Sequence, residues 1–206
     1  MTIFRAIQKS EVRALYASPK TKRMPKNVPY LVDNLWEWLR PSGYPSRRHA
    51  VYASPNQELA LGSAHPNGTN RTHFAVGRVI PVGTVRAVQL KVTDAKRHPD
   101  VEALPDAIRQ WLGQSWIDSP LTMKLPLGAL FLPVVDSEDV ERALNQIPGG
   151  DELRKVIVKT SSFWADATPL DVNMACLSNE SGELFFEAPD GYRLVFESLT
   201  QQAPLL

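Results

Sequence analysis

The segment Ser46–Leu61 constrains the fold more than any other part of the chain. Near its start are three consecutive side chains that can carry a positive charge, and Ala50–Ala53 then favours a β-strand. Ser54 is a good N-cap, Pro55 suits the first position of a helix, and Gln57 completes a capping box. The sequence therefore predicts a strand that turns directly into a helix starting near Pro55.

The first N–H groups of this predicted helix have no partners within the helix, and they would lie close to arginines. A helix N-terminus beside arginines suits a phosphate or another anion. The simpler interpretation is a capped strand–turn–helix on a solvated face, without a ligand. The local pattern leaves both interpretations open.

Charge is distributed unevenly along the chain. Residues 1–100 contain 16 lysines and arginines against 6 acidic residues, a net charge of +10, whereas residues 101–206 contain 7 against 16, a net charge of −9. A basic half suits an anionic ligand, either a nucleotide diphosphate or a nucleic-acid backbone. Attraction between the two halves, or an acidic partner protein, explains the asymmetry equally well.

Composition indicates an ordinary globular protein with a substantial core, because 43% of the 206 residues are hydrophobic and 22% are charged. No apolar run is long enough to span a membrane, and we expect no membrane partner. Cys176 is the only cysteine, which excludes an intrachain disulfide and a cysteine-based zinc cluster. These features favour a cytoplasmic protein.

Hydrophobic periodicity and turn residues predict the secondary structure. The expected helices begin near Ser10, at Pro29 (ending at Arg40), near Pro55, at Val101 (ending at Leu112) and at Asp136 or Ser137. The expected strands are Thr2–Ile7, Ala50–Ala53, Phe74–Val82, Thr84–Val92, Gly128–Leu132, Leu153–Thr160, Val172–Leu177, Glu183–Glu187 and Tyr192–Phe196. Because strands and helices do not alternate regularly, we expect a single α+β domain over residues 1–206, with two small antiparallel sheets packed together.

Two further segments bear on binding. The connector Lys20–Lys26 carries four cations and is either a solvated loop or a contact for nucleic acid or an antitoxin. His65, His73 and His98 lack the close spacing of metal ligands, so the sequence predicts no metal site.

The order of these features resembles the ADP-ribosyltransferase superfamily, especially its small bacterial and phage toxin-like members. The residues that carry the resemblance are Arg5 on the first strand, Tyr52 and Ser54 on the strand entering the capped helix, and Glu183 at the start of a late strand. The resemblance covers most of the chain through short motifs. It implies split antiparallel β-sheets with flanking helices.

The resemblance also implies roles for these residues. Arg5 would hold NAD, with Arg40, Arg47 or Arg48 as alternatives, and Tyr52 with Ser54 would lie near the nicotinamide. Glu183 would stabilise the oxocarbenium-like state formed when the nicotinamide–ribose bond breaks. We expect Glu183 to face the same pocket as Arg5 and Tyr52, at an exposed strand start where its replacement costs little stability.

The chain departs from the family pattern at two places. It has no Ser-Thr-Ser motif, and no Glu-x-Glu or Gln-x-Glu pair precedes the late strand. Glu187 lies four residues after Glu183 and would point to the same face of a strand, which makes it the rival catalytic carboxylate. The missing pair leaves the target of the reaction open.

The leading hypothesis is therefore NAD-dependent transfer of ADP-ribose to RNA, DNA or protein, by a toxin, effector or phage-defence component with an antitoxin or inhibitor protein as a further partner. NAD hydrolysis without an acceptor requires the same pocket. A different class of function is a non-enzymatic module that binds nucleic acid or a partner through Lys20–Lys26 and Arg40–Arg48.

Overall fold

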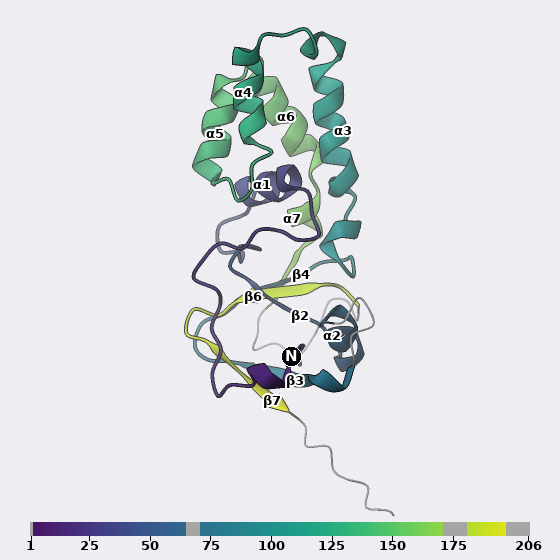
Figure 1. Cartoon of the computed structure of the whole chain (residues 1–206), viewed down its shortest axis with the longest axis vertical. Coiled ribbons are helices and arrows are strands. Elements are labelled where there is room, and N and C mark those ends of the chain that lie inside the picture. The colour runs from purple at the N-terminus through teal and green to yellow at the C-terminus, as the bar shows by residue number, and fades with distance from the viewer. Residues whose placement is uncertain (1, 65–70, 171–180, 197–206) are drawn as a thin grey trace, which may run out of the picture.

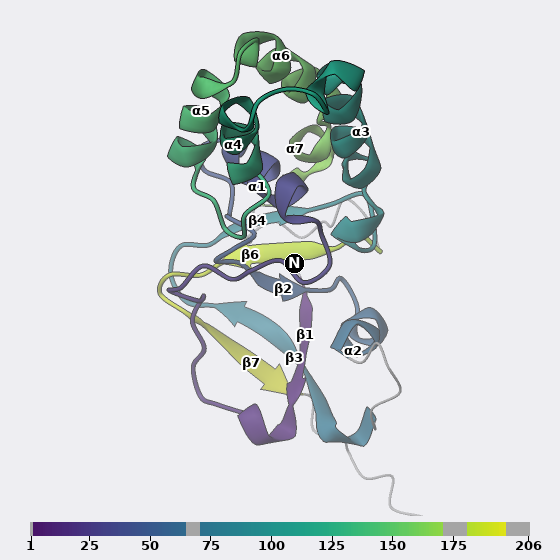
Figure 2. The same cartoon turned by 45° about the horizontal axis from the view of Figure 1, so that its top comes forward.

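In the computed structural model, which describes residues 2–64, 71–170 and 181–196, helices and sheets occupy opposite ends of an elongated molecule. Figure 1 shows most of the helices gathered at one end, one sheet across the middle and a second sheet at the other end. Figure 2 shows α2 (Gln57–Ala64) apart from the other helices, beside β1 and β3 at the sheet end. The chain therefore forms three layers, and the middle layer is a sheet.

The outer sheet has three antiparallel strands in the order β1–β3–β7, where β1 is Phe4–Gln8, β3 is Phe74–Pro81 and β7 is Tyr192–Phe196. Arg5 lies opposite Gly77 on β3. The first and the last described strands thus both pair with the central strand β3, and β1 forms one edge of the sheet.

The middle sheet has four antiparallel strands in the order β2–β6–β4–β5, which are Val51–Ala53, Leu184–Glu187, Arg86–Gln89 and Thr168–Leu170. Tyr52 on β2 lies opposite Phe185 on β6. An isolated bridge between Phe4 and Ser54 connects this sheet to the outer sheet. The predicted strand at Ala50–Ala53 therefore lies between the first strand and the late strand.

The helices other than α2 lie on the side of the middle sheet that faces away from the outer sheet. They are α1 (Tyr30–Trp38), α3 (Asp100–Leu112), α4 (Leu121–Ala129), α5 (Ser137–Gln146), α6 (Gly150–Thr160) and α7 (Phe163–Asp166). Short 3₁₀ turns are present at Lys9–Glu11, Arg71–His73, Ala95–Arg97 and Gln114–Trp116. In Figure 2, α1 and α7 are the helices nearest the middle sheet.

Strand β6 separates two hydrophobic clusters because its side chains alternate between faces. Leu184 and Phe186 belong to the cluster between the two sheets, whereas Phe185 belongs to the cluster beneath the helices. Trp36 of α1 and Phe163 of α7 stack above this face with ring centroids 3.9 Å apart. Glu183 and Glu187 lie two residues before and two residues after Phe185. Their side chains therefore point to the same face of the sheet as Phe185, toward the helices.

The expected α+β class with two antiparallel sheets is confirmed. Strand β7 has the predicted bounds, and α1 begins directly after Pro29. The helical spacing of Leu31, Val32, Leu35, Trp36 and Leu39 predicts the buried face of this helix; the first four are buried and Leu39 is half-buried. The predicted strand Val172–Leu177 lies outside the described residues.

Three predicted elements are wrong. Gly128–Leu132 belongs to the end of α4 and the turn after it, and Leu153–Thr160 belongs to α6. In α6, Leu153 and Ile157 are the buried pair, four residues apart, so packing against neighbouring helices overrides the β-branched composition. The helix expected from Ser10 is only a 3₁₀ turn with no buried residue.

Candidate functional site

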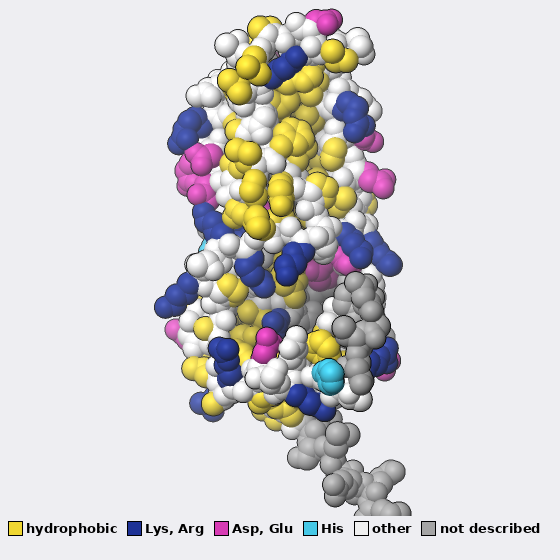
Figure 3. Space-filling view, viewed as in Figure 1, with side chains coloured by type: hydrophobic (Ala, Val, Ile, Leu, Met, Phe, Trp, Pro, Cys, Tyr) yellow, Lys and Arg dark blue, Asp and Glu magenta, His cyan; other side chains and the backbone are white. Residues whose placement is uncertain are grey.

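A cleft of about 1420 Å³ lies where the two sheets meet the helical part of the molecule. Its walls come from β1, β2, α2, the start of α1, the connector before α1 and the segments 93–97 and 181–183. Figure 3 shows lysine and arginine side chains gathered in a band at this level of the molecule. Eight lysines and arginines line the cleft against four aspartates and glutamates, so a predominantly cationic site is available to a ligand.

The five residues singled out from the sequence all line this cleft: Arg5, Arg47, Tyr52, Ser54 and Glu183. They come from β1, the turn before β2, β2 itself, the residue after β2 and the residue before β6. The middle sheet brings them together because β2 and β6 are neighbours, and the Phe4–Ser54 bridge places β1 beside them.

Arg47 lies at the floor of the cleft, with only 4% of its side chain exposed. Its guanidinium lies 5.4–5.6 Å from the ring centroids of Trp36, Tyr52, Phe163 and Phe185. Aromatic faces attract a cation, which compensates in part for its removal from water. However, Nε and Nη1 of Arg47 are buried without a hydrogen-bond partner among the described residues. Such donors are rare in folded proteins and call for an acceptor.

Glu183 is the acidic neighbour of Arg47, with Oε1 3.7 Å from Nη1 of the arginine. The backbone N–H of Ala95 donates a hydrogen bond to its other carboxylate oxygen. Burial raises the pKa of the Glu183 carboxyl above its ordinary value, although the charge of Arg47 and the Ala95 N–H oppose the rise. The expectation of an exposed carboxylate was wrong, because only 13% of the side chain is accessible.

Tyr52 is the centre of the cationic wall. Nη1 of Arg5 donates to its backbone oxygen at 2.8 Å, and its hydroxyl donates to the backbone oxygen of Arg47 at 3.3 Å. The guanidinium groups of Arg23 and Arg47 lie 5.4 and 5.5 Å from its ring centroid. Nε of Arg5 and Nε of Arg23 are also buried without a partner among the described residues. Two arginines thus lie over the Tyr52 ring and a third binds the backbone of the same residue, and each has a buried Nε without a partner among the described residues.

Sequence reasoning gave Arg23 a role only within the cationic connector Lys20–Lys26, as a contact for nucleic acid or an antitoxin, and did not place it in the NAD pocket. The signal that points to it is the cationic connector Lys20–Lys26, which it occupies. The Arg23 guanidinium donates to the backbone oxygen of Ala50, and this contact draws the connector over the start of β2. Met24, Pro25 and Lys26 then line the cleft beside it.

The predicted capping box is wrong. Ser54 exchanges two backbone hydrogen bonds of 2.8 Å with Phe4 and so continues the strand pairing rather than capping a helix. Helix α2 begins at Gln57, and the side chain of Asn56 accepts a hydrogen bond from the N–H of Leu59 at 2.9 Å. Asn56 takes the capping position because the Ser54 backbone is engaged in the bridge between the sheets.

The alternative candidates make other contacts. Arg40 pairs with Glu37, and the buried Arg48 pairs with Asp33 and reaches only the wall of the cleft. Glu187 lines a separate cavity of about 330 Å³, where it accepts a hydrogen bond from the N–H of Ser46. Glu183 and Glu187, four residues apart in the sequence, therefore line different cavities. Arg47 and Arg48 are buried, so Arg40 is the only arginine of Arg40–Arg48 that is partly exposed.

In comparisons with known proteins, no family model matches this chain, and no curated protein or solved structure does so either. What the fold and cleft define is an α+β protein of two antiparallel sheets with a cationic, aromatic-floored cleft. In the part of the chain that the structure describes, no helix has the length and apolarity needed to cross a membrane. The same residues contain no cluster of three or more histidine, cysteine or acidic side chains suited to a metal ion.

Proposed function

We propose that the cleft binds NAD and that the protein transfers ADP-ribose from NAD to a macromolecule. The observation that carries this proposal is the Arg47–Glu183 pair at the floor of the cleft, where Nε and Nη1 of a buried cation have no hydrogen-bond partner among the described residues and lie beside a carboxylate with a raised pKa. Perturbed titratable groups in a cleft are typical of functional sites. The cationic wall supplies partners for the diphosphate.

The arrangement of strands supports the resemblance to ADP-ribosyltransferases. In that family, an arginine on the first strand, a tyrosine or serine on a second strand and a late glutamate at a strand start surround NAD. Here, Arg5, Tyr52 and Glu183 stand on three neighbouring chain segments around one cleft. We therefore propose that the two sheets form an ADP-ribosyltransferase-like core.

The proposed reaction breaks the bond between the nicotinamide nitrogen and C1′ of the ribose. Its electron pair leaves with nicotinamide, and a lone pair of the acceptor forms the new bond to C1′ while the acceptor loses a proton to solvent. The carboxylate of Glu183 would stabilise the positive charge that develops on the ribose. Arg5 and Arg23 would hold the diphosphate, and Arg47 would keep Glu183 ionised and oriented.

Nicotinamide release from NAD by the purified protein tests the proposal. We expect release by the wild type and a loss of about 10²-fold or more in Glu183→Gln. Glu141→Gln is the matched control, since Glu141 is also paired with an arginine, Arg154, and accepts an N–H bond, from Trp38, but lies in the helical part. No release by the wild type, with or without added RNA, DNA and protein acceptors, would show that the proposal is wrong. Equal release by wild type and Glu183→Gln would remove the carboxylate mechanism.

A further inference from the structure

The position of Arg47 is not fixed by hydrogen bonds from the guanidinium atoms Nε and Nη1. Both atoms are buried and unpartnered among the described residues, and the Glu183 carboxylate lies at 3.7 Å, longer than a hydrogen bond. Four aromatic rings pack around the guanidinium, and the backbone of Arg47 sets the point from which its side chain enters them. The contacts of the residues on either side of Arg47 therefore help to decide where its charge lies.

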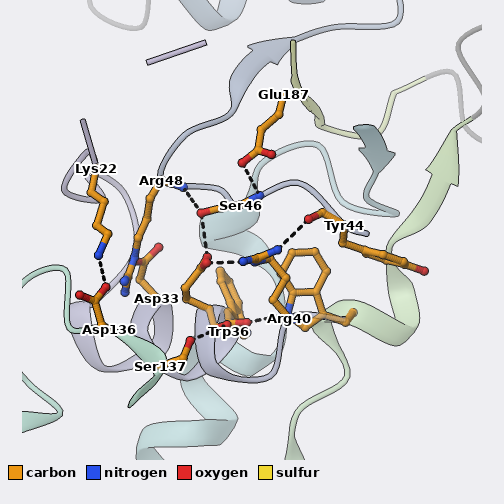
Figure 4. A network of polar contacts seen from close by, with 12 residues as sticks. Lys22, Asp33, Trp36, Arg40, Tyr44, Ser46, Arg48, Asp136, Ser137 and Glu187 are labelled. Atoms are coloured by element: carbon orange, nitrogen blue, oxygen red, sulfur yellow. Dashed lines mark hydrogen bonds and ion pairs between the residues drawn. The ribbon is translucent and has the colours of Figure 1, made fainter. Parts of the chain in front are cut away.

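Ser46 makes the connections on one side of Arg47. Its N–H donates to Glu187 Oε1 at 2.9 Å, and its hydroxyl donates to Glu37 Oε2 at 3.0 Å. The same hydroxyl accepts from the N–H of Arg48 at 3.2 Å, and the N–H of His49 donates to the Ser46 backbone oxygen at 3.1 Å. Figure 4 shows Ser46 between Glu187 of the middle sheet and the helix α1 below it.

Arg48 makes the connections on the other side. Its Nε donates to Asp33 at 3.0 Å, its Nη2 to Asn34 at 2.6 Å, and its Nη1 to the backbone oxygen of Val135 at 2.7 Å. Arg48 is 2% exposed, so these bonds are shielded from water. The turn Ser46–His49 is thus attached to the middle sheet, to α1 and to the segment before α5, and Arg47 is the residue in it whose side chain enters the aromatic floor of the cleft.

We infer that Ser46 is a positioning residue, whose hydroxyl joins Glu37 to the Arg48 N–H and so holds the Arg47 guanidinium at the floor of the cleft. Ser46 lines the second cavity and not the cleft itself, so it acts on a ligand only through Arg47. Its use in anion binding rests on the proposed function, whereas its control of the Arg47 position does not.

The first test follows the Nε–H resonance of Arg47 by NMR, assigned from its loss in Arg47→Lys. Four aromatic rings surround this group, so its chemical shift reports its position. We expect Ser46→Ala to move the signal and speed its exchange with water. Ser137→Ala is the matched control, because Ser137 lines the same cavity and its hydroxyl donates to the Glu37 backbone oxygen at 3.4 Å, while no hydrogen bond to the Ser46–His49 turn is present among the described residues. An unchanged Arg47 signal in Ser46→Ala overturns the inference.

The second test measures binding of ADP-ribose to the whole protein. We expect Ser46→Ala to weaken binding about 10-fold, since two hydrogen bonds to the turn are lost. In the Arg47→Lys background, adding Ser46→Ala should weaken binding no further, whereas a purely structural effect would be additive. Additive losses overturn the inference. Wild-type protein that neither binds ADP-ribose nor cleaves NAD refutes the proposed function, whereas the NMR result still stands.

If Ser46→Ala does not fold, Glu37→Gln replaces it in the NMR test. This substitution weakens the acceptor of the Ser46 hydroxyl and keeps the volume of the Glu37 side chain.

Discussion

Nη1 of Arg47 lies 3.7 Å from Oε1 of Glu183, and both side chains are almost fully enclosed between the aromatic floor of the cleft and the end of β6. Two opposite charges in a poorly solvated place attract one another strongly, yet each also loses its hydration. At this distance the two side chains do not form a hydrogen bond, and Nε and Nη1 of Arg47 have no other partner in the part of the chain that the structure describes.

Replacing Glu183 should change the free energy of unfolding, because its attraction to Arg47 and the loss of hydration of both charges oppose one another. Glu183→Ala leaves the buried Arg47 without its carboxylate and the Ala95 N–H without its acceptor, so we expect a loss of about 1–3 kcal/mol. Glu183→Gln keeps an acceptor oxygen and should lose less. Denaturant titration of both variants measures the difference, and equal stability of Glu183→Ala and wild type would contradict the buried environment described for this residue.

The pH dependence of nicotinamide release should follow the ionisation of Glu183. The carboxylate is the proposed active form, and burial raises its pKa. The rate should therefore fall as the pH drops through a value above the ordinary glutamate pKa of about 4.3. A profile of kcat/KM against pH measures this limb. In Arg47→Lys, an altered distance to the balancing cation should displace the limb, and an acidic limb at or below the ordinary glutamate value would contradict the assignment.

Arg23 provides a test of the cationic wall that leaves the carboxylate intact. Arg23→Gln removes one positive charge beside Tyr52, and we expect KM for NAD to rise about 10-fold or more with a smaller change in kcat. Lys20→Gln is the matched control, because Lys20 is an exposed cation of the same connector that does not line the cleft. Equal KM values in the two variants would show that net charge, rather than the place of Arg23, governs binding.

Elements with local signals could be predicted from the sequence. The turn before β7 follows from Pro189-Asp190-Gly191, and Gly191 indeed has φ of 100°, a conformation that favours glycine. The apolar spacing of α1 identifies its buried face in the same way. The sequence predicts a strand in place of α6 because the β-branched residues of this segment favour a strand locally. The segment forms a helix instead because it packs against α3 and α5.

The site could be predicted only in part. The family resemblance singled out Glu183, and Arg47 as one of several alternatives to Arg5, but the sequence could not show that Arg47 and Glu183 meet, because they lie 136 residues apart. Their burial depends on partners from α1, α7 and β6, and no local pattern records those contacts. The cap at Asn56 was missed for a similar reason, since the pairing of Ser54 with Phe4 is a contact between distant segments.

The sequence analysis did not single out Asp100. In the structure, its carboxylate connects several segments of the helical part through hydrogen bonds. It accepts hydrogen bonds from Trp36 Nε1 at 2.9 Å, the Ser161 hydroxyl at 2.7 Å and the Ser162 N–H at 3.0 Å. Burial alone would raise the pKa of Asp100, but the contacts with His98, Ser162, Ser161 and Trp36 outweigh it and hold the pKa far below its ordinary value. The ionised form is therefore the one that the folded state stabilises.

Asp100→Asn should accordingly destabilise the protein by about 2–4 kcal/mol at neutral pH, because a neutral amide cannot accept all these hydrogen bonds. A depressed pKa contributes stability that is complete above the ordinary aspartate pKa of about 4 and is lost as the pH falls below it. The gap in unfolding free energy between wild type and Asp100→Asn should therefore be constant from about pH 7 to 5 and narrow below about pH 4. Urea titrations across this range measure the gap.

Asp106→Asn is the control, since Asp106 is an exposed residue of the same helix whose only described ion pair is with Arg109. It should change stability by less than about 0.5 kcal/mol at every pH. A gap for Asp100→Asn that does not narrow in acid would mean that its hydrogen bonds stabilise the fold without favouring the carboxylate.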